Sequence, residues 1–131
     1  MVFRKYGTPD VLELVDLEKP SPKAGEVLVK IHATTVTAGD CEFRRLDFPI
    51  FVRFPMRIFM AFAMPKFKML GQEFSGTIET VGADVPGLKP GDEIFGNTGI
   101  KFGACAEYKA VSTKGAIGLK PANASFEEAA G

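Results

Sequence analysis

The strongest constraint on the fold is one long run of β-branched and apolar residues, at positions 26–37 (EVLVKIHATTVT). Branched side chains fit the pleated surface of a strand and lose little freedom there, so this run favours extended structure. A turn-forming segment at 19–25 precedes it and contains two prolines, each of which fixes the backbone angle φ. Residues 26–37 are therefore the strongest strand prediction in the chain.

Several shorter segments are further strand candidates. Residues 11–17 alternate apolar and acidic side chains, as a half-buried strand does. The later candidates, separated by Gly/Pro turns, are 76–82, 93–96, 106–112 and 116–119. Short strands between such turns predict a mainly β fold, either an antiparallel sandwich or a partly open barrel.

Two short helices are expected beside the strands. Asp40 stands where a helix cap is expected, ahead of Phe43 and Leu46 on one helix face. Ser125 precedes Glu128 by the three residues of a capping box, which predicts a helix start. The sequence stops one turn later, so we expect the chain to be a fragment of a longer protein.

Composition narrows the class of protein. The chain has 131 residues, enough for one domain, and its 16 basic side chains balance 16 acidic ones. This balance argues against nucleic-acid binding, which needs a clear cationic excess. Two cysteines are too few for a disulfide framework or a four-cysteine metal site. The sequence contains no signal peptide and no membrane-spanning run, so a cytoplasmic protein without a membrane span is expected.

The most specific motif is at residues 71–85 (GQEFSGTIETVGADV), followed by 89–94 (KPGDEI). Together these segments resemble the N-terminal, GroES-like domain of medium-chain dehydrogenases/reductases. Segments 33–40, 102–108 and 125–130 match the same family in the same order. The resemblance implies a GroES-like partly open barrel with short helices over residues 1–131. It also implies a nucleotide-binding Rossmann domain in the missing part of the protein.

The resemblance bears directly on zinc. Zinc-dependent relatives have a cysteine where this chain has Thr37 and a histidine where it has Gln72. Catalytic zinc needs three protein ligands and an open position, and an amide is a poor ligand beside imidazole or thiolate. The structural zinc lobe is also missing, because Cys105 is the only cysteine after Gly96. We therefore expect no metal.

His32, Cys41, Cys105 and Glu73 lack the spacing of metal ligands. We interpret them as a strand histidine, a helix-face thiol, a core thiol and a structural hydrogen-bond acceptor.

The zinc-independent, quinone-oxidoreductase-like branch implies hydride transfer from NADPH to quinones, enones or carbonyls. Thr37 and Asp40 match polar positions near the nicotinamide and the substrate in that branch, so both are candidate catalytic residues, and Thr37 is also the candidate cofactor contact. Asp40 is equally well explained as a helix cap. Gln72 and Glu73 are expected to line the emptied zinc pocket. Residues 96–103 are glycine-rich but lack a dinucleotide fingerprint, so NADPH binding is assigned mainly to the missing domain and the fragment is expected to be inactive alone.

Residues 48–69 form a basic segment rich in Phe and Met. A helix is expected here, with Pro55 in its first turn and Pro65 at its end. Three interpretations remain open. The segment covers the substrate pocket, with Phe54 and Phe59 lining it; it docks the missing domain or another copy, which predicts self-association; or it is an amphipathic helix at a membrane surface.

Two other functions also remain open. One is a zinc-type alcohol dehydrogenase domain with degenerate ligands, and the other is a free-standing GroES-like binding module. Metal content distinguishes the first from the reductase, and the length of the parent protein distinguishes the second.

Overall fold

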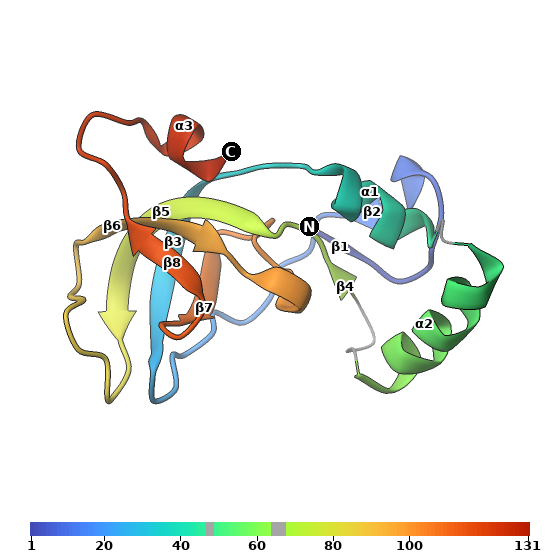
Figure 1. The fold of residues 1–131 in the computed structure, drawn as a ribbon, viewed down its shortest axis with the longest axis horizontal. Helices are drawn as coiled ribbons and strands as arrows, with labels where there is room; N and C mark the ends of the chain where they lie inside the picture. Colours follow the sequence, from blue (N-terminus) through green and yellow to red (C-terminus); the bar gives the residue numbers. More distant parts are fainter. Residues whose placement is uncertain (47–48, 64–67) are drawn as a thin grey trace.

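The computed structural model describes residues 1–46, 49–63 and 68–131. The elements, in chain order, are β1 (Val2–Phe3), η1 (Pro9–Val11), β2 (Leu12–Glu13), β3 (Glu26–Thr34), α1 (Ala38–Arg45), α2 (Ile50–Ala63), β4 (Lys68–Met69), β5 (Glu73–Val81), β6 (Glu93–Asn97), η2 (Gly99–Lys101), β7 (Tyr108–Ser112), β8 (Ala116–Leu119) and α3 (Phe126–Ala130). Figure 1 shows a curled sheet at one end of the molecule and α1 and α2 at the other.

The main sheet has five antiparallel strands in the order β7-β3-β5-β6-β8. β3 and β5 are its longest strands, and their pairing contains two register irregularities, which increase local twist. At Gly76 the strands approach so closely that an added Cβ would lie 2.2 Å from the Lys30 carbonyl oxygen. The predicted mainly β, partly open barrel with short helices is confirmed (Figure 1).

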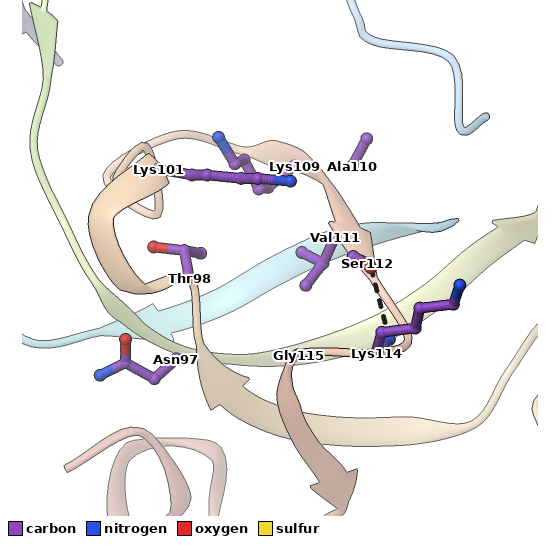
Figure 2. A pocket seen from close by; sticks show the side chains of 9 residues that line it. All are labelled: Asn97, Thr98, Lys101, Lys109, Ala110, Val111, Ser112, Lys114 and Gly115. Carbon is purple, nitrogen blue, oxygen red and sulfur yellow. Dashed lines mark hydrogen bonds between the residues drawn. The ribbon is translucent and has the colours of Figure 1, made fainter. Parts of the chain in front are cut away.

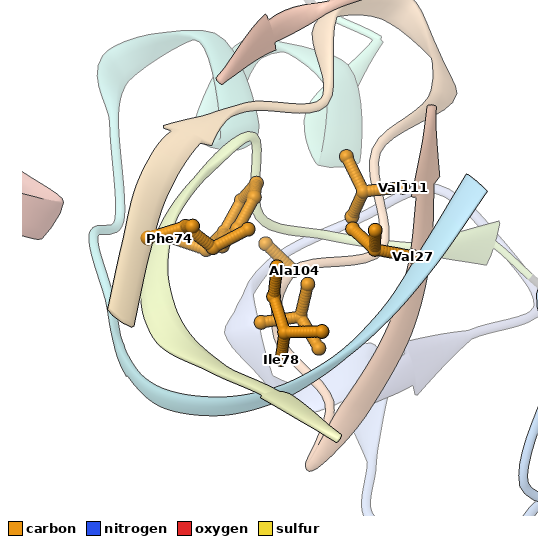
Figure 3. Packing of buried hydrophobic residues seen from close by; sticks show 7 residues of the cluster. Val27, Phe74, Ile78, Ala104 and Val111 are labelled. Carbon is orange, nitrogen blue, oxygen red and sulfur yellow. The ribbon is translucent and has the colours of Figure 1, made fainter. Parts of the chain in front are cut away.

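The main hydrophobic core lies within this curled sheet. Its buried members are Val27, Val29, Phe74, Ile78, Ile94, Ala104 and Val111. Figure 3 shows side chains from β3, β5 and β7 converging on one another, with Ala104 among them. In β3 the buried Val27 and Val29, two residues apart, point to this core, whereas Leu28 between them is buried outside it.

A second core lies under α1 and a small sheet of order β2-β1-β4. Phe3 packs edge-on against Phe43 with ring centroids 6.0 Å apart, and Phe102 stacks on Phe43 at 4.3 Å. The guanidinium of the buried Arg44 donates a hydrogen bond to the Gly7 carbonyl. This core holds α1 in a defined position relative to the start of β5.

Residues 11–17 differ from expectation. Only β2 (Leu12–Glu13) is a strand there, paired over two residues with β1. The alternation of apolar and acidic residues continues past Glu13, where the pairing with β1 ends. Leu14 has no partner strand to cover it and is 90% exposed. The predicted strands at 26–37 and 106–112 are shorter in the structure, ending at Thr34 and beginning at Tyr108 respectively.

The two predicted short helices are present as α1 and α3, and α2 differs from its prediction in the position of one proline. Ser125 and Glu128 form the expected capping box of α3, which packs on β3 and β5. Pro55 lies inside α2 rather than in its first turn. Pro65 lies outside the described residues. In the described part of the chain, no helix is long and apolar enough to cross a membrane.

Candidate functional site

Thr37 and Asp40 form the N-terminal cap of α1. Thr37 is the cap residue, and its hydroxyl and its backbone N–H both donate to Asp40 Oδ2 at 3.0 Å. The Asp40 N–H donates back to Thr37 Oγ1 at 3.3 Å. The cap is therefore Thr37, with Asp40 as its reciprocal partner, rather than Asp40 alone. Because the Thr37 hydrogen is bound to Asp40, Oγ1 keeps one lone pair to accept a further hydrogen bond.

Asp40 also holds the segment that leads into β5. Its side chain is 1% exposed, and Oδ1 accepts a hydrogen bond from the Gly71 N–H at 2.8 Å. Gly71 has φ +90°, and an added Cβ would lie 2.4 Å from the Cys105 amide nitrogen. Both oxygens of Asp40 are thus engaged within the protein, which gives this residue a positioning role.

Gln72 follows Gly71 and lies beside the cap of α1. Gln72 Oε1 and Thr37 Oγ1 lie 3.4 and 3.5 Å from the point that a Cβ on Gly39 would occupy. Gln72 Nε2 donates to the Gly99 carbonyl at 3.2 Å. The backbone is held as well, since the Thr98 N–H and hydroxyl donate to the Gln72 carbonyl at 2.7 and 3.1 Å. The structure therefore brings together Thr37 and Gln72, which lie far apart in sequence.

Glu73 ties the end of β3 to the start of β5. Its Oε2 accepts a hydrogen bond from the Thr35 hydroxyl at 2.5 Å, and its carbonyl accepts one from the Thr34 hydroxyl at 2.7 Å. The side chain is half-buried. These contacts match the sequence interpretation of Glu73 as a structural acceptor.

The two predicted pocket phenylalanines are on α2. Phe54 is 70% exposed, so in this chain its ring faces solvent instead of covering the Thr37–Gln72 cluster. Figure 1 places α2 beyond β4 and α1, at the end of the molecule opposite α3. The side chain of Phe59 lies outside the described residues. A pocket-lining role for either phenylalanine stays a prediction.

Cys105 and His32 have partners within the protein. Burial and the nearby Asp40 charge raise the pKa of the Cys105 thiol, while a hydrogen bond with Thr34 acts in the opposite direction. The His32 ring lies 4.4 Å from that of Phe126, and its Nε2 is 3.1 Å from the Thr77 hydroxyl. In the parts of the chain that the structure describes, no three His, Cys, Asp or Glu side chains are placed to hold a metal ion.

Thr98, which donates hydrogen bonds to the Gln72 carbonyl, also lines a hollow of about 230 Å³. Figure 2 shows it between η2, β7 and the turn that leads to β8, with Lys101, Lys109 and Lys114 around it. Sequence reasoning missed this hollow, because no motif marks it. The closely spaced lysines between 101 and 114 are the one signal that points to it.

Comparison with known proteins agrees with this architecture. Residues 23–128 match the family model of the alcohol dehydrogenase GroES-like domain. The chain is 37% identical to a 2-methylene-furan-3-one reductase of Solanum lycopersicum over 98% of its length and 32% of the relative. It is 33% identical to a chloroplastic NADPH-dependent alkenal/one oxidoreductase of Arabidopsis thaliana, over 99% of this chain and 33% of the relative.

A solved structure shares the whole fold. The quinone oxidoreductase from Coxiella burnetii superposes with a TM-score of 0.83 at 31% identity, covering 98% of this chain and 38% of that one. The chain spans about a third of the length of the curated relatives it matches. The match over residues 23–128 and the shared barrel lead to one conclusion: this chain belongs to the alcohol dehydrogenase GroES-like domain family of the medium-chain dehydrogenases/reductases.

Proposed function

We propose that the chain is the substrate-binding and catalytic domain of a zinc-independent, NADPH-dependent oxidoreductase. Its substrates belong to one of three classes: activated alkenes such as enones, quinones, or carbonyl compounds. Support comes from the relatives, whose names describe an NADPH-dependent alkenal/one oxidoreductase, a furanone reductase and a quinone oxidoreductase. Nucleotide binding is assigned mainly to a second domain outside this chain, so the chain alone is expected to be inactive.

The observation that carries the proposal is the convergence of Thr37 and Gln72 beside Gly39. Zinc relatives, by the resemblance, use cysteine and histidine at these two positions. Here a hydroxyl and an amide lie near Gly39 instead, and both are neutral hydrogen-bonding groups rather than good zinc ligands. Such groups suit a reductase in which the acceptor is polarised by hydrogen bonds.

The two residues offer complementary hydrogen bonds. Gln72 Nε2 uses one N–H on Gly99, and its second N–H has no acceptor among the described residues. We assign that N–H to the carbonyl oxygen of the substrate, where negative charge develops during reduction. Thr37 Oγ1 has a lone pair left to accept from a carboxamide N–H, since its own hydrogen is bound to Asp40.

NADPH fits this donor and acceptor set. A nicotinamide carboxamide donates two N–H bonds, and Thr37 Oγ1 and Gln72 Oε1 are the two acceptors assigned to them, so the second N–H of Gln72 is left for the substrate. When bound, the cofactor supplies the hydride. Asp40 fixes Thr37 and Gly71, and Glu73 fixes residues 34–35, so both act as positioning residues.

The first test is the metal content of protein purified without chelators, measured by elemental mass spectrometry. We expect near-zero zinc per chain. About one zinc per chain would contradict the proposal and favour the zinc-type alcohol dehydrogenase, with His32, Cys41 and Glu73 as the first ligands to mutate.

The second test is NADPH oxidation by the parent protein, with an enone, a quinone and a simple alcohol plus NADP⁺ as alternatives. The Gln72→Ala variant is expected to lower kcat for the enone by about 100-fold, the typical effect of removing a donor to a developing oxyanion. Gln72→Glu is the matched variant, because it keeps the size of the side chain and loses the N–H. Unchanged kcat in both variants would remove Gln72 from the mechanism.

A further inference from the structure

Three lysines are among the residues that line the hollow beyond Thr98. Lys101 comes from η2, Lys109 from β7 and Lys114 from the turn between β7 and β8. Figure 2 shows Lys101 and Lys109 next to each other on one side and Lys114 on the other. At about 230 Å³ the hollow exceeds the roughly 30 Å³ that one water occupies in the liquid, so it has room for a small ion.

Lys109 is the most constrained of these lysines. Its side chain is half-buried, and its ammonium nitrogen lies 2.6 Å from the point that a Cβ on Gly103 would occupy. No hydrogen-bond acceptor or ion-pair partner for Nζ is found in the described ranges of the chain. Burial lowers the pKa of Lys109, as does the charge of Lys101, and the Glu26 carboxylate offsets part of this effect. A desolvated ammonium without a counter-ion is costly, and a bound anion would remove that cost.

Two residues with neutral polar side chains, Ser112 and Asn97, line the same hollow. Ser112 Oγ accepts a hydrogen bond from the Lys114 N–H at 3.3 Å, and its own hydrogen has no acceptor in the part of the structure that is described. Asn97 Oδ1 accepts from the Gly99 N–H at 2.7 Å, which leaves its Nδ2 likewise without an acceptor among those residues. The hollow therefore combines ammonium, hydroxyl and amide donors, with few acceptors in competition.

We propose that this hollow is a phosphate-binding site, in which Lys101 and Lys109 contact a dianionic phosphate group and Ser112 donates to it. Two neighbouring ammonium groups match two negative charges, whereas a carboxylate neutralises only one of them. Lysine binds phosphate as a point charge and needs no planar geometry for it. The site is separate from the Thr37–Gln72 cluster, and its existence does not depend on the proposed reductase activity.

Phosphate binding is measured by NMR on the ¹⁵N-labelled 131-residue chain, with ionic strength held constant with sodium chloride. Inorganic phosphate is expected to cause saturable shifts of the Ser112 and Lys114 amides. Glycerol 2-phosphate is the second ligand. Equal affinity for both would show that the phosphate group alone is recognised, and tighter binding of the ester would show contacts to an organic phosphate.

Lys109→Gln is expected to weaken binding about tenfold, the loss of one charge-assisted contact. Lys101→Gln removes the other ammonium group of the pair and is expected to weaken binding as well. Because Lys101 is exposed, this variant should fold normally even if Lys109→Gln does not. Lys5→Gln is the matched control, because it removes one exposed positive charge away from the hollow. Equal affinities in all three variants, or shifts that never saturate, would overturn the proposal, since they would show only general charge screening.

Discussion

Asp40 accepts a buried hydrogen bond of 2.8 Å from the backbone N–H of Gly71, although 31 residues separate them in sequence. The same carboxylate binds the cap of α1 through Thr37. One side chain therefore sets the distance between the helix start and the segment that carries Gln72. The Thr37–Gln72 arrangement depends on this carboxylate as much as on the two residues themselves.

Replacing Asp40 with Asn is expected to reduce the free energy of unfolding by about 2–3 kcal/mol. The amide has only one acceptor oxygen, so an N–H from Gly71 or Thr37 would face another donor in a buried site. Urea unfolding at neutral pH measures the change. Asp10→Asn is the matched control: Asp10 is exposed, accepts one hydrogen bond from the Thr8 hydroxyl, and should change stability by no more than about 0.5 kcal/mol. Similar losses in both variants would contradict the role of Asp40.

Gly71→Ala tests how closely the backbone at Gly71 approaches the backbone of Cys105. Gly71 and Gly87 both have positive φ, +90° and +78°, but only Gly71 has a backbone atom within 2.4 Å of its would-be Cβ. Gly87 has nothing within 4 Å. Gly87→Ala should therefore cost about 1–2 kcal/mol from backbone strain alone, and Gly71→Ala at least about 2 kcal/mol more. Thermal unfolding of both variants provides the comparison, and equal costs would show that the approach to Cys105 relaxes freely.

Local patterns in the sequence predicted where most strands of the sheet lie, but not how far each strand pairs with its neighbour. Residues 116–119 were predicted as a strand with the bounds that β8 has, and 26–37 contains all of β3. Residues 11–17 alternate apolar and acidic side chains, yet only β2 forms there, because β1 offers two pairing positions. Alternation describes a side-chain pattern, whereas strand length is decided by the partner strand.

The candidate site was predicted in a similar way. The motif pointed to Thr37, Asp40, Gln72 and Glu73, and the structure places Thr37 and Gln72 side by side. The bond from Asp40 to Gly71 could not be predicted, because no local rule links a helix cap to a distant glycine. The sequence also could not predict that the Lys109 ammonium has no partner among the described residues, because pairing depends on which groups the fold brings together.

Thr37→Ala is expected to cost about 1 kcal/mol of stability through loss of the helix cap. In the parent protein it should also raise KM for NADPH, because the proposed carboxamide contact is lost. Ser125→Ala is the matched control, since it removes the capping box of α3 at a similar cost in stability. Steady-state kinetics of both variants separate the two effects. Equal KM values for both variants would assign Thr37 a capping role only.

The Cys105 thiol is expected to react slowly with alkylating reagents near neutral pH. Its pKa is raised by burial and by the charge of Asp40, so the reactive thiolate forms only above the usual thiol range. Since the folded-state pKa exceeds the unfolded one, the protonated thiol contributes stability at low and neutral pH. That contribution is lost as pH rises through the folded-state pKa. Alkylation rate against pH, followed by mass spectrometry, measures the midpoint, and Thr34→Val should move it higher still. A midpoint below that of a model thiol would contradict this prediction.

The exposed apolar face of α2 is expected to drive self-association of the chain. Ile50, Phe51, Phe54 and Ile58 are between 48% and 83% exposed on one helix, and contiguous apolar surface of this kind usually marks a contact region. The double variant Phe51→Ser, Phe54→Ser should shift sedimentation toward the monomer at high protein concentration. Leu14→Ser is the matched control, because it removes an equally exposed apolar side chain outside α2. If the unaltered chain sediments as a monomer at the highest concentration, α2 is not a self-association surface, which leaves the substrate pocket, the missing domain and a membrane surface as the contacts of its apolar face.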